Sequence, residues 1–370
     1  MHTLALLAVE IPEVQEDEKM DEKISADINK MEKQYNSKKS VTLQILINKL
    51  SSCKSAFSRA VNSAVKDIMI PYCTSNPNYM EFEDHTEDLL KKYESVADCI
   101  RTPQGTIILP ENHPLSGRFV IQDGKVFQKD SGPLYHLKRT KRAKKMAPIL
   151  NYPIKKLYST FEEYAESQAL DYDQQSQRYG YYYNPNAIWD WYSIGGQWPD
   201  MFLVSKTCKE FSLGERNWCN MRIKYKAPDG YMWVCAARKQ NIEWEIMSSW
   251  KKQKATEEFY RLKDMFTSGI LKYEFKGKIM PDGIISYGRY VYRKEHTLEA
   301  WLDEYAMTKN LKYPGCTNDI IDKSQWLSKD DNIFDPNTGK LIPLDWHNIL
   351  NEYIDNTHDD TVLVGVDYHI

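Results

Sequence analysis

The chain has 370 residues, with 49 Lys and Arg against 52 Asp and Glu, so its formal net charge at pH 7 is −3. That balance excludes a histone-like polycation and a strongly acidic mimic of DNA, and the length allows two domains or one domain with large insertions. Aromatic residues are abundant at 12%, in a chain whose 42% apolar and 27% charged residues are those of an ordinary globular protein.

Cysteine usage and the hydrophobic runs indicate the compartment. The seven Cys are widely spaced and include no Cys-x-x-Cys pair, which favours reduced thiols over a disulfide framework or a zinc site. The run His2–Val9 is too short for a signal peptide, and acidic residues follow it. No stretch reaches the roughly 18–20 apolar residues of a membrane span. We therefore expect a cytoplasmic protein without a membrane partner.

In the first half of the chain, hydrophobic periodicity predicts a strand, two helices and then short strands. The strand covers 3–11 and ends at Pro12. Apolar residues at steps of three and four from Leu43 to Ile68 predict one long helix that stops before Pro71. The remaining elements are a helix over 86–99 and strands at 106–108, 119–121 and 125–128, the last two joined by a turn at Asp123-Gly124.

The second half mixes aromatic strands with amphipathic helices. A capping box, Ser159 or Thr160 with Glu162 or Glu163, predicts a helix over about 160–170. The other expected elements are a strand-like stretch at 179–205, hairpins at the Pro-Asp-Gly turns 228–230 and 281–283, helices over 256–266, over 297–307 and from Asp345, and a terminal strand at 361–366.

These elements predict an α+β fold with an antiparallel, ferredoxin-like sheet core assembled from both chain ends and the middle. Apolar strands at the two ends belong to one sheet in that architecture, and strands interspersed with helices favour α+β over a doubly wound sheet. The expected segments are a first core strand (1–14), a mainly helical insertion (15–105), β-hairpins with a basic segment (106–160), a core segment with the WDWY motif (161–205), a second, α/β insertion (206–270), and core completion with the terminal strand (271–370).

A basic segment is the first candidate binding site. Six of the eight residues at 138–145 are basic: Lys138, Arg139, Lys141, Arg142, Lys144 and Lys145. Such a cluster can contact the phosphates of a nucleic acid, with an affinity that falls as salt is added. A solvated surface loop or a contact with an acidic partner protein explains the same charges equally well.

The second candidate is the aromatic motif at 179–198, where eight of twenty residues are Tyr or Trp. Its binding candidates are Trp189, Asp190, Trp191, Tyr192, Gly195, Gly196, Gln197 and Trp198. One interpretation places the Trp side chains in the core, with Asp190 fixing a loop. The other is a platform that stacks on a base, with Asp190 accepting a hydrogen bond from an amino group. The solvent exposure of Trp189 and Trp191 distinguishes the two.

Residues 183–198 (YNPNAIWDWYSIGGQW) resemble the signature NPNxxWDWYxIGGRW of an uncharacterised protein family of bacteriophages and other mobile elements in Gram-positive bacteria. The opening strand, 179–205, 280–292 and the ending 366–369 also match, since members commonly end in a strand followed by Asp-x-His. The resemblance implies a ferredoxin-like fold, a mobile-element origin and the cytoplasm of a bacterial host, but no catalytic residues. Gln197 stands where the family usually has Arg, which weakens any anion-binding role of that position.

Catalytic motifs are absent from the sequence: there is no Walker loop, GxGxxG, GxSxG or HExxH. Asp367 and His369 have strand spacing on one face, but two ligands do not make a metal site. We therefore predict no metal, cofactor or catalytic residue, and a non-enzymatic phage protein that binds a host defence protein or ribonucleoprotein, for example as an anti-CRISPR inhibitor. The alternatives are a stand-alone RNA, DNA or nucleotide binding protein, and a metal-dependent nuclease that uses clustered carboxylates.

Overall fold

The chain divides into two compact units in the computed structural model. Unit 1 combines Met1–Cys73 with Ile188–Ile370, and unit 2 is Thr74–Ala187. The structure describes residues 2–15, 17–110, 119–129, 137–138, 140–198, 200–215, 226–272, 275–305, 312–314, 317–322, 325–335 and 339–370. The expected segments 15–105 and 161–205 each fall partly in unit 1 and partly in unit 2.

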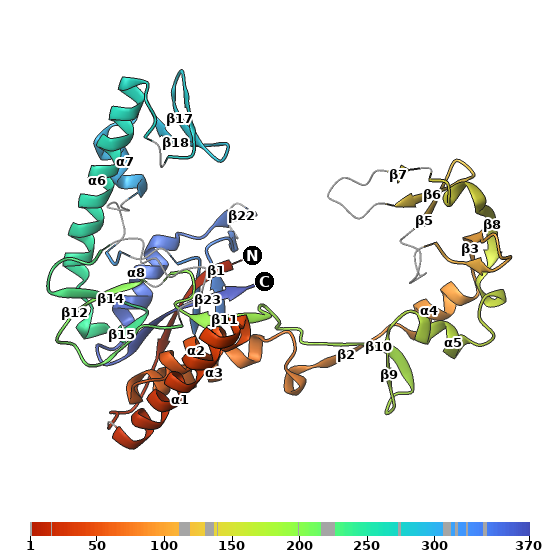
Figure 1. Ribbon diagram of the computed structural model, residues 1–370, viewed down its shortest axis with the longest axis horizontal. Helices are drawn as coiled ribbons and strands as arrows, with labels where there is room; N and C mark the ends of the chain where they lie inside the picture. The colour runs from red at the N-terminus through yellow and green to blue at the C-terminus, as the bar shows by residue number, and fades with distance from the viewer. Residues whose placement is uncertain are drawn as a thin grey trace. The chain divides into compact units, whose positions relative to one another are not determined.

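Unit 1 is built around a sheet in which the two ends of the chain are neighbours (Figure 1). β1 (His2–Val9) pairs antiparallel with β23 (Val362–His369) from end to end. On the other side of β23 lies β11 (Trp191–Ile194) from the Trp-rich motif. The first strand, the last strand and the middle of the chain therefore share one sheet, as predicted. The further strands are β13 (Phe211–Ser212), β15 (Ala236–Arg238), β19 (Asp319–Asp322) and β20 (Gln325–Ser328), in the order β13-β15-β23-β1-β19-β20.

One strand pair departs from the antiparallel sheet that the sequence predicts. β1 and β19 run in parallel, with Ala5 opposite Asp319 and Leu7 opposite Ile321. An apolar pattern shows which residues of a strand are buried but not in which direction its neighbour runs, so this pairing could not be read from the sequence. The fold class is α+β with a mixed central sheet.

Helices cover both faces of this sheet, which explains why its central strands are apolar on both sides. On one face, Leu7 of β1 belongs to the same buried cluster as Val61 of α3. On the other face, Leu6 belongs to a second cluster with Met247 of α6 and Leu350 of α8. The three helices are α3 (Ala56–Met69), α6 (Trp244–Ser268) and α8 (Trp346–Asn356).

The single long helix predicted between Leu43 and Ile68 is wrong, because the chain forms two helices there. α1 (Glu18–Lys38) precedes them, α2 (Val41–Ser52) ends before Cys53, and α3 begins at Ala56. Ser55 starts α3 by accepting a hydrogen bond from the Ser58 backbone N–H at 3.1 Å. A serine side chain satisfies a free N–H at a helix start, and this local cap outweighs the continuous apolar period.

The far half of α6 carries a separate small core in unit 1. Its Phe259, Leu262 and Met265 are buried with Trp301. The elements around them are β16 (Lys278–Met280), β17 (Gly283–Ser286), β18 (Arg289–Arg293) and α7 (Leu298–Tyr305). The hairpin predicted at Pro-Asp-Gly 281–283 is confirmed, since Met280 lies opposite Gly283.

The carboxyl group of Asp319 is buried in the central sheet and accepts a hydrogen bond from Tyr368 Oη at 2.5 Å. Burial raises its pKa above the usual 3.8, and the hydrogen bond from Tyr368 opposes this shift. The folded state therefore holds this proton more tightly than the unfolded chain, so this group costs stability as the pH rises from 3.8 through the raised pKa.

We accordingly expect wild type to lose stability relative to Asp319→Asn over that pH range, because asparagine keeps an acceptor for Tyr368 but does not titrate. Urea unfolding at a series of pH values measures the difference between the two proteins. A difference that stays constant with pH contradicts the assignment.

Unit 2 combines two helices with three small sheets among its described residues. The first sheet contains β2 (Glu81–Asp84), β10 (Arg178–Tyr183) and β9 (Asp171–Asp173). The second contains β4 (Ile107–Ile108), β3 (Val96–Arg101) and β8 (Ala147–Pro153). The third contains β5 (Phe119–Gln122), β6 (Lys125–Lys129) and β7 (Leu137–Lys138). The hairpin at Asp123-Gly124 is confirmed by the β5–β6 pairing. One core cluster joins the second and third sheets through Ile100 and Phe119.

The two helices of unit 2 are α4 (Thr86–Tyr93) and α5 (Phe161–Ser167). The helix predicted over 86–99 is too long, because from Val96 the chain pairs with β8 as a strand and buries Ile100. The predicted capping box is confirmed: Thr160 Oγ1 accepts from Glu163 N at 3.1 Å, and Glu163 Oε2 accepts from Ser159 N at 2.6 Å.

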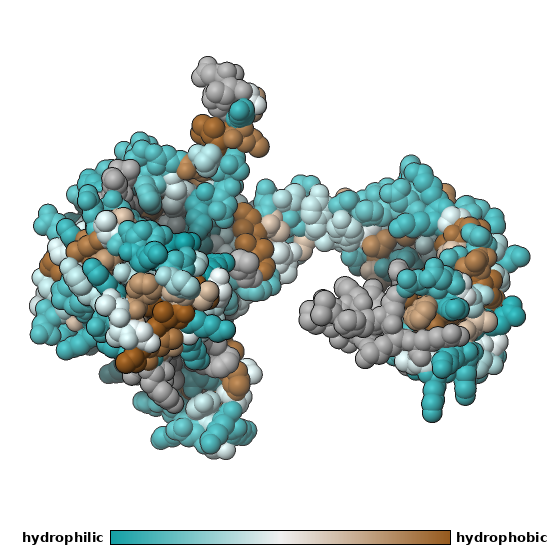
Figure 2. All heavy atoms as spheres, turned by 90° about the horizontal axis from the view of Figure 1, so that it is seen from above, coloured by the Kyte–Doolittle hydropathy of each residue, from teal (hydrophilic) through white to brown (hydrophobic). Residues whose placement is uncertain are grey.

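The remaining described strands of unit 1 are β12 (Phe202–Ser205), β14 (Tyr231–Val234), β21 (Asn332–Asp335) and β22 (Lys340–Pro343). Among the residues that the structure describes, short 3₁₀ helices cover Ile70–Tyr72, Pro77–Tyr79, Ala143–Lys145, Ile154–Lys156 and Lys239–Asn241. Hydrophilic residues occupy most of the surface in view, with separate hydrophobic patches between them (Figure 2). In the described part of the chain, no helix combines the length and the apolar composition that a membrane crossing requires.

Candidate functional site

The basic segment lies in unit 2, between β7 and β8. Lys138 belongs to β7, whereas Arg139 lies outside the described residues. The other four basic side chains are exposed: Lys141, Arg142, Lys144 and Lys145. Within the described residues, no carboxylate forms an ion pair with any of these four.

The local sequence explains why the four cations face outward. Thr140 Oγ1 accepts a hydrogen bond from Ala143 N at 3.2 Å, and Thr140 O accepts one from Lys144 N at 3.1 Å, which together form a tight turn. Ala143 and Met146 point into the core of unit 2, where they pack with Phe119. These two apolar anchors leave the neighbouring basic side chains in solvent.

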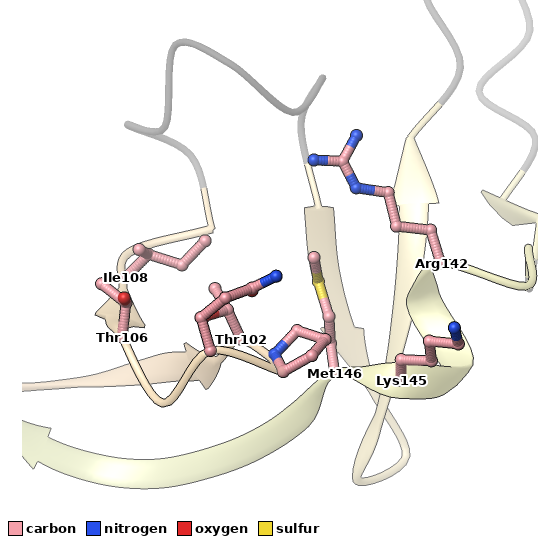
Figure 3. A pocket seen from close by; sticks show the side chains of 8 residues that line it. Thr102, Thr106, Ile108, Arg142, Lys145 and Met146 are labelled. Carbon is pink, nitrogen blue, oxygen red and sulfur yellow. The ribbon is translucent and has the colours of Figure 1, made fainter.

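A pocket of about 430 Å³ opens beside this segment. Its lining residues are Thr102, Pro103, Gln104, Thr106, Ile108, Arg142, Lys145 and Met146. Arg142 and Lys145 lie on one side of the pocket, Thr106 and Ile108 on the other, and Met146 between them (Figure 3). The lining offers two cations, hydroxyl and amide groups, and no carboxylate. Such a set suits an anion such as a phosphate group.

Exposed tyrosines form a second feature of unit 2. Tyr181, Tyr182 and Tyr183 of β10 are each at least 38% exposed. The ring of Tyr181 stacks on that of His85, with centroids 5.0 Å apart and planes 19° apart, and it meets Tyr183 edge-on at 5.9 Å. Aromatic side chains on an exposed strand are the groups on which unpaired bases stack in many single-strand binding proteins.

The Trp-rich motif of unit 1 is divided between core and surface. Trp189 is only 8% exposed, and its Nε1 donates a hydrogen bond to Met69 O at 2.9 Å. Its ring meets Tyr192 edge-on at 4.8 Å. Burial raises the pKa of the half-buried Tyr192 to about 12, and the negative charge of Glu215 adds to the shift. Trp189 therefore fills the core, and its ring is not accessible to a base.

Within the stretch predicted as strand-like at 179–205, Trp189 and Asp190 precede a strand that begins only at residue 191. β11 is Trp191–Ile194, so Trp189 and Tyr192 pack against the same core cluster instead of lying on opposite faces. Trp191 is half-buried beside His2, and Trp198 is half-buried against the second core cluster.

The glycine pair of the motif lets the chain fold over a buried carboxylate. Gly196 has a φ of +47°, and a Cβ at this position would lie 2.2 Å from Asp367 Oδ2. The next residue, Gln197, donates its backbone N–H to the same oxygen at 2.9 Å, while its side chain is exposed. The backbone N–H of Trp198 donates a hydrogen bond to Gly195 O at 2.8 Å, which closes the turn.

Asp190 is tied to the last strand in two ways. Its backbone N–H donates to His369 O at 3.1 Å, and its Oδ1 lies 3.0 Å from His369 Nδ1. The sequence pointed to Asp190, Asp367 and His369 but missed His2, which lies 3.0 Å from Asp367 Oδ1. His2 and Asp367 are 365 positions apart, and only the β1–β23 pairing brings them together.

Among the residues that the structure describes, no group of three or more His, Cys, Asp and Glu side chains is arranged to hold a metal ion.

No known protein family, curated protein or solved structure matches the chain.

Proposed function

We propose that this chain is a nucleic-acid-binding protein whose unit 2 contacts phosphates through the basic segment. The observation that carries the proposal is the cluster of four exposed cations, without a carboxylate partner among the described residues, beside a pocket that contains no acidic side chain. Electrostatic attraction of this kind supplies most sequence-independent affinity for a polyanion. The exposed tyrosines of β10 support a single-stranded ligand, because every unpaired base offers a face for stacking.

The inhibitor of host defence that the mobile-element resemblance suggests is a narrower form of this proposal. A ribonucleoprotein defence complex presents RNA together with protein, and the same cations would contact its phosphates. For the fold, we propose that the central sheet is a ferredoxin-like sheet to which β19 has been added in parallel beside β1. Pull-down from lysate of a Gram-positive host tests this narrower form, and it is supported only if nuclease treatment releases the partner.

Fluorescence anisotropy with labelled single-stranded RNA, single-stranded DNA and duplex DNA over a range of salt tests the general proposal. We expect wild type to bind a single strand with an affinity that falls with salt. The variant K141Q/R142Q/K144Q/K145Q should bind at least about tenfold more weakly and lower the salt slope by up to about 3, since each phosphate contact on a single strand contributes about 0.7.

The matched control is K91Q/K92Q/K125Q/K156Q, which removes four exposed basic side chains from other parts of unit 2. It changes the net charge by the same amount, so general charge loss affects both variants equally. Equal binding by the two variants would remove the basic segment from the interface. Absence of binding by wild type at low salt would end the proposal.

A further inference from the structure

Three strands of unit 1 place two histidines and a tryptophan side by side at one end of the central sheet. His2 of β1 lies opposite His369 of β23, and His369 lies opposite Trp191 of β11. Residues that oppose each other in neighbouring antiparallel strands project from the same face. The ring centroids of His2 and His369 are 5.4 Å apart, and those of His2 and Trp191 are 5.8 Å apart.

A separate carboxylate orients each imidazole. His2 Nδ1 lies 3.0 Å from Asp367 Oδ1, and His369 Nδ1 lies 3.0 Å from Asp190 Oδ1. A carboxylate in its ionised form only accepts hydrogen bonds, so in that form of each pair Nδ1 is the donor. The lone pair of each neutral ring is then on Nε2. A carboxylate that fixes the tautomer and orientation of an imidazole in this way is the usual partner of a histidine that transfers protons.

Only one of the two carboxylates is buried, since the Asp190 side chain is 56% exposed. Asp367 is fully buried and is held by a second hydrogen bond, from Gln197 N at 2.9 Å. Burial raises the pKa of its carboxyl group, and the hydrogen bond from His2 opposes that shift. The side chains of His2 and His369 are 39% and 41% exposed. A buried carboxylate therefore supports His2, and both imidazoles are exposed enough for a solute to reach them.

Two adjacent imidazoles can act as general base and general acid on one substrate. A substrate that carries its own nucleophile needs no further reacting group from the protein. RNA carries its own nucleophile, the 2′-hydroxyl beside each phosphodiester. We propose that His2 and His369 form an acid–base pair that cleaves RNA, with Asp367 and Asp190 as positioning residues; the choice of RNA rests on the proposed nucleic-acid binding.

The reaction balances without any further reagent. The neutral imidazole takes the 2′-hydroxyl proton at Nε2 while the 2′-oxygen forms a bond to phosphorus. The bond between phosphorus and the 5′-oxygen breaks, and the protonated imidazole gives its Nε2 proton to that leaving oxygen. The products are a 2′,3′-cyclic phosphate and a 5′-hydroxyl, and proton exchange with water restores both rings. Trp191 lies where its ring can contact a base of the bound strand.

The test uses the full chain and the dinucleoside monophosphate UpA in buffer with EDTA, with the product identified as the cyclic phosphate. We expect wild type to cleave UpA but not its deoxy analogue. His2→Ala and His369→Ala should each lower kcat/KM by about 10²-fold or more. His358→Ala is the control, since His358 is an exposed histidine that also faces an aspartate, Asp360, at 3.8 Å. Asp190→Asn should lower kcat and leave KM nearly unchanged.

Absence of turnover by wild type, equal rates for all variants, or a requirement for a divalent cation would each overturn the proposal. Equal rates would identify a contaminating ribonuclease. The cleavage proposal and the binding proposal can fail independently, because they are tested in different assays. UpA cleavage by K91Q/K92Q/K125Q/K156Q should match wild type, whereas the double variant H2A/H369A should lose cleavage and still bind a single-stranded RNA as tightly as wild type does in the anisotropy assay.

Discussion

Replacing Trp189 with alanine is expected to lower the free energy of unfolding by about 3–5 kcal/mol, the usual cost of truncating a buried Trp. The side chain is 8% exposed within the cluster that joins the central sheet to α3. Its loss opens a cavity and leaves Met69 O without the indole donor at 2.9 Å. Urea unfolding followed by circular dichroism measures the effect without depending on the fluorescence of the residue removed.

Trp191→Ala is the matched control, because it removes the same side chain two residues away. Trp191 is half-buried beside His2 and belongs to neither large core cluster. We expect it to cost roughly half as much at most, since hydrophobic stabilisation follows the apolar area removed from water. Equal losses for the two variants would contradict the assignment of Trp189 to the core and of Trp191 to the surface.

The sheet that holds the ends of the chain could be predicted because its strands are apolar on both faces. Strands of this kind need other elements packed on both faces and therefore belong in the middle of a sheet. β1 and β23 both lie there, with a core cluster on each face. The parallel direction of β19 could not be predicted, since side-chain alternation is the same for both directions. The break between α2 and α3 could not be predicted either, because the apolar period continues through it. It depends on the Ser55 side chain, which caps the start of α3.

The candidate site was predictable only where its residues are close together in the sequence. The basic segment is a local cluster, and the structure leaves four of its side chains exposed. The spacing of Asp367 and His369 was visible, but their partners come from other strands. His2 is one isolated histidine at the start of an apolar run, and nothing local distinguishes it from a surface residue. The registers of β1 and of β11 on β23 create the two carboxylate–imidazole contacts. The sequence predicted that these strands share a sheet, but the apolar pattern did not give their registers.

Gly196→Ala is expected to lower the free energy of unfolding by about 2–5 kcal/mol. A φ of +47° costs alanine about 1–2 kcal/mol. The added Cβ would lie 2.2 Å from Asp367 Oδ2, so the buried carboxylate has to leave its hydrogen bonds with Gln197 N and His2, which costs about 1–3 kcal/mol more. Urea unfolding measures the loss.

Gly269→Ala is the control that measures the backbone strain of a positive φ without a steric contact. Gly269 ends α6 with a φ of +71°, and nothing lies within 4 Å of a Cβ placed there. This variant should therefore cost only the backbone term of about 1–2 kcal/mol and leave UpA cleavage unchanged. Gly196→Ala should reduce cleavage as well, because His2 loses the carboxylate that orients its ring. If both glycine variants show the same stability and the same cleavage rate, Asp367 can move aside freely and does not position His2.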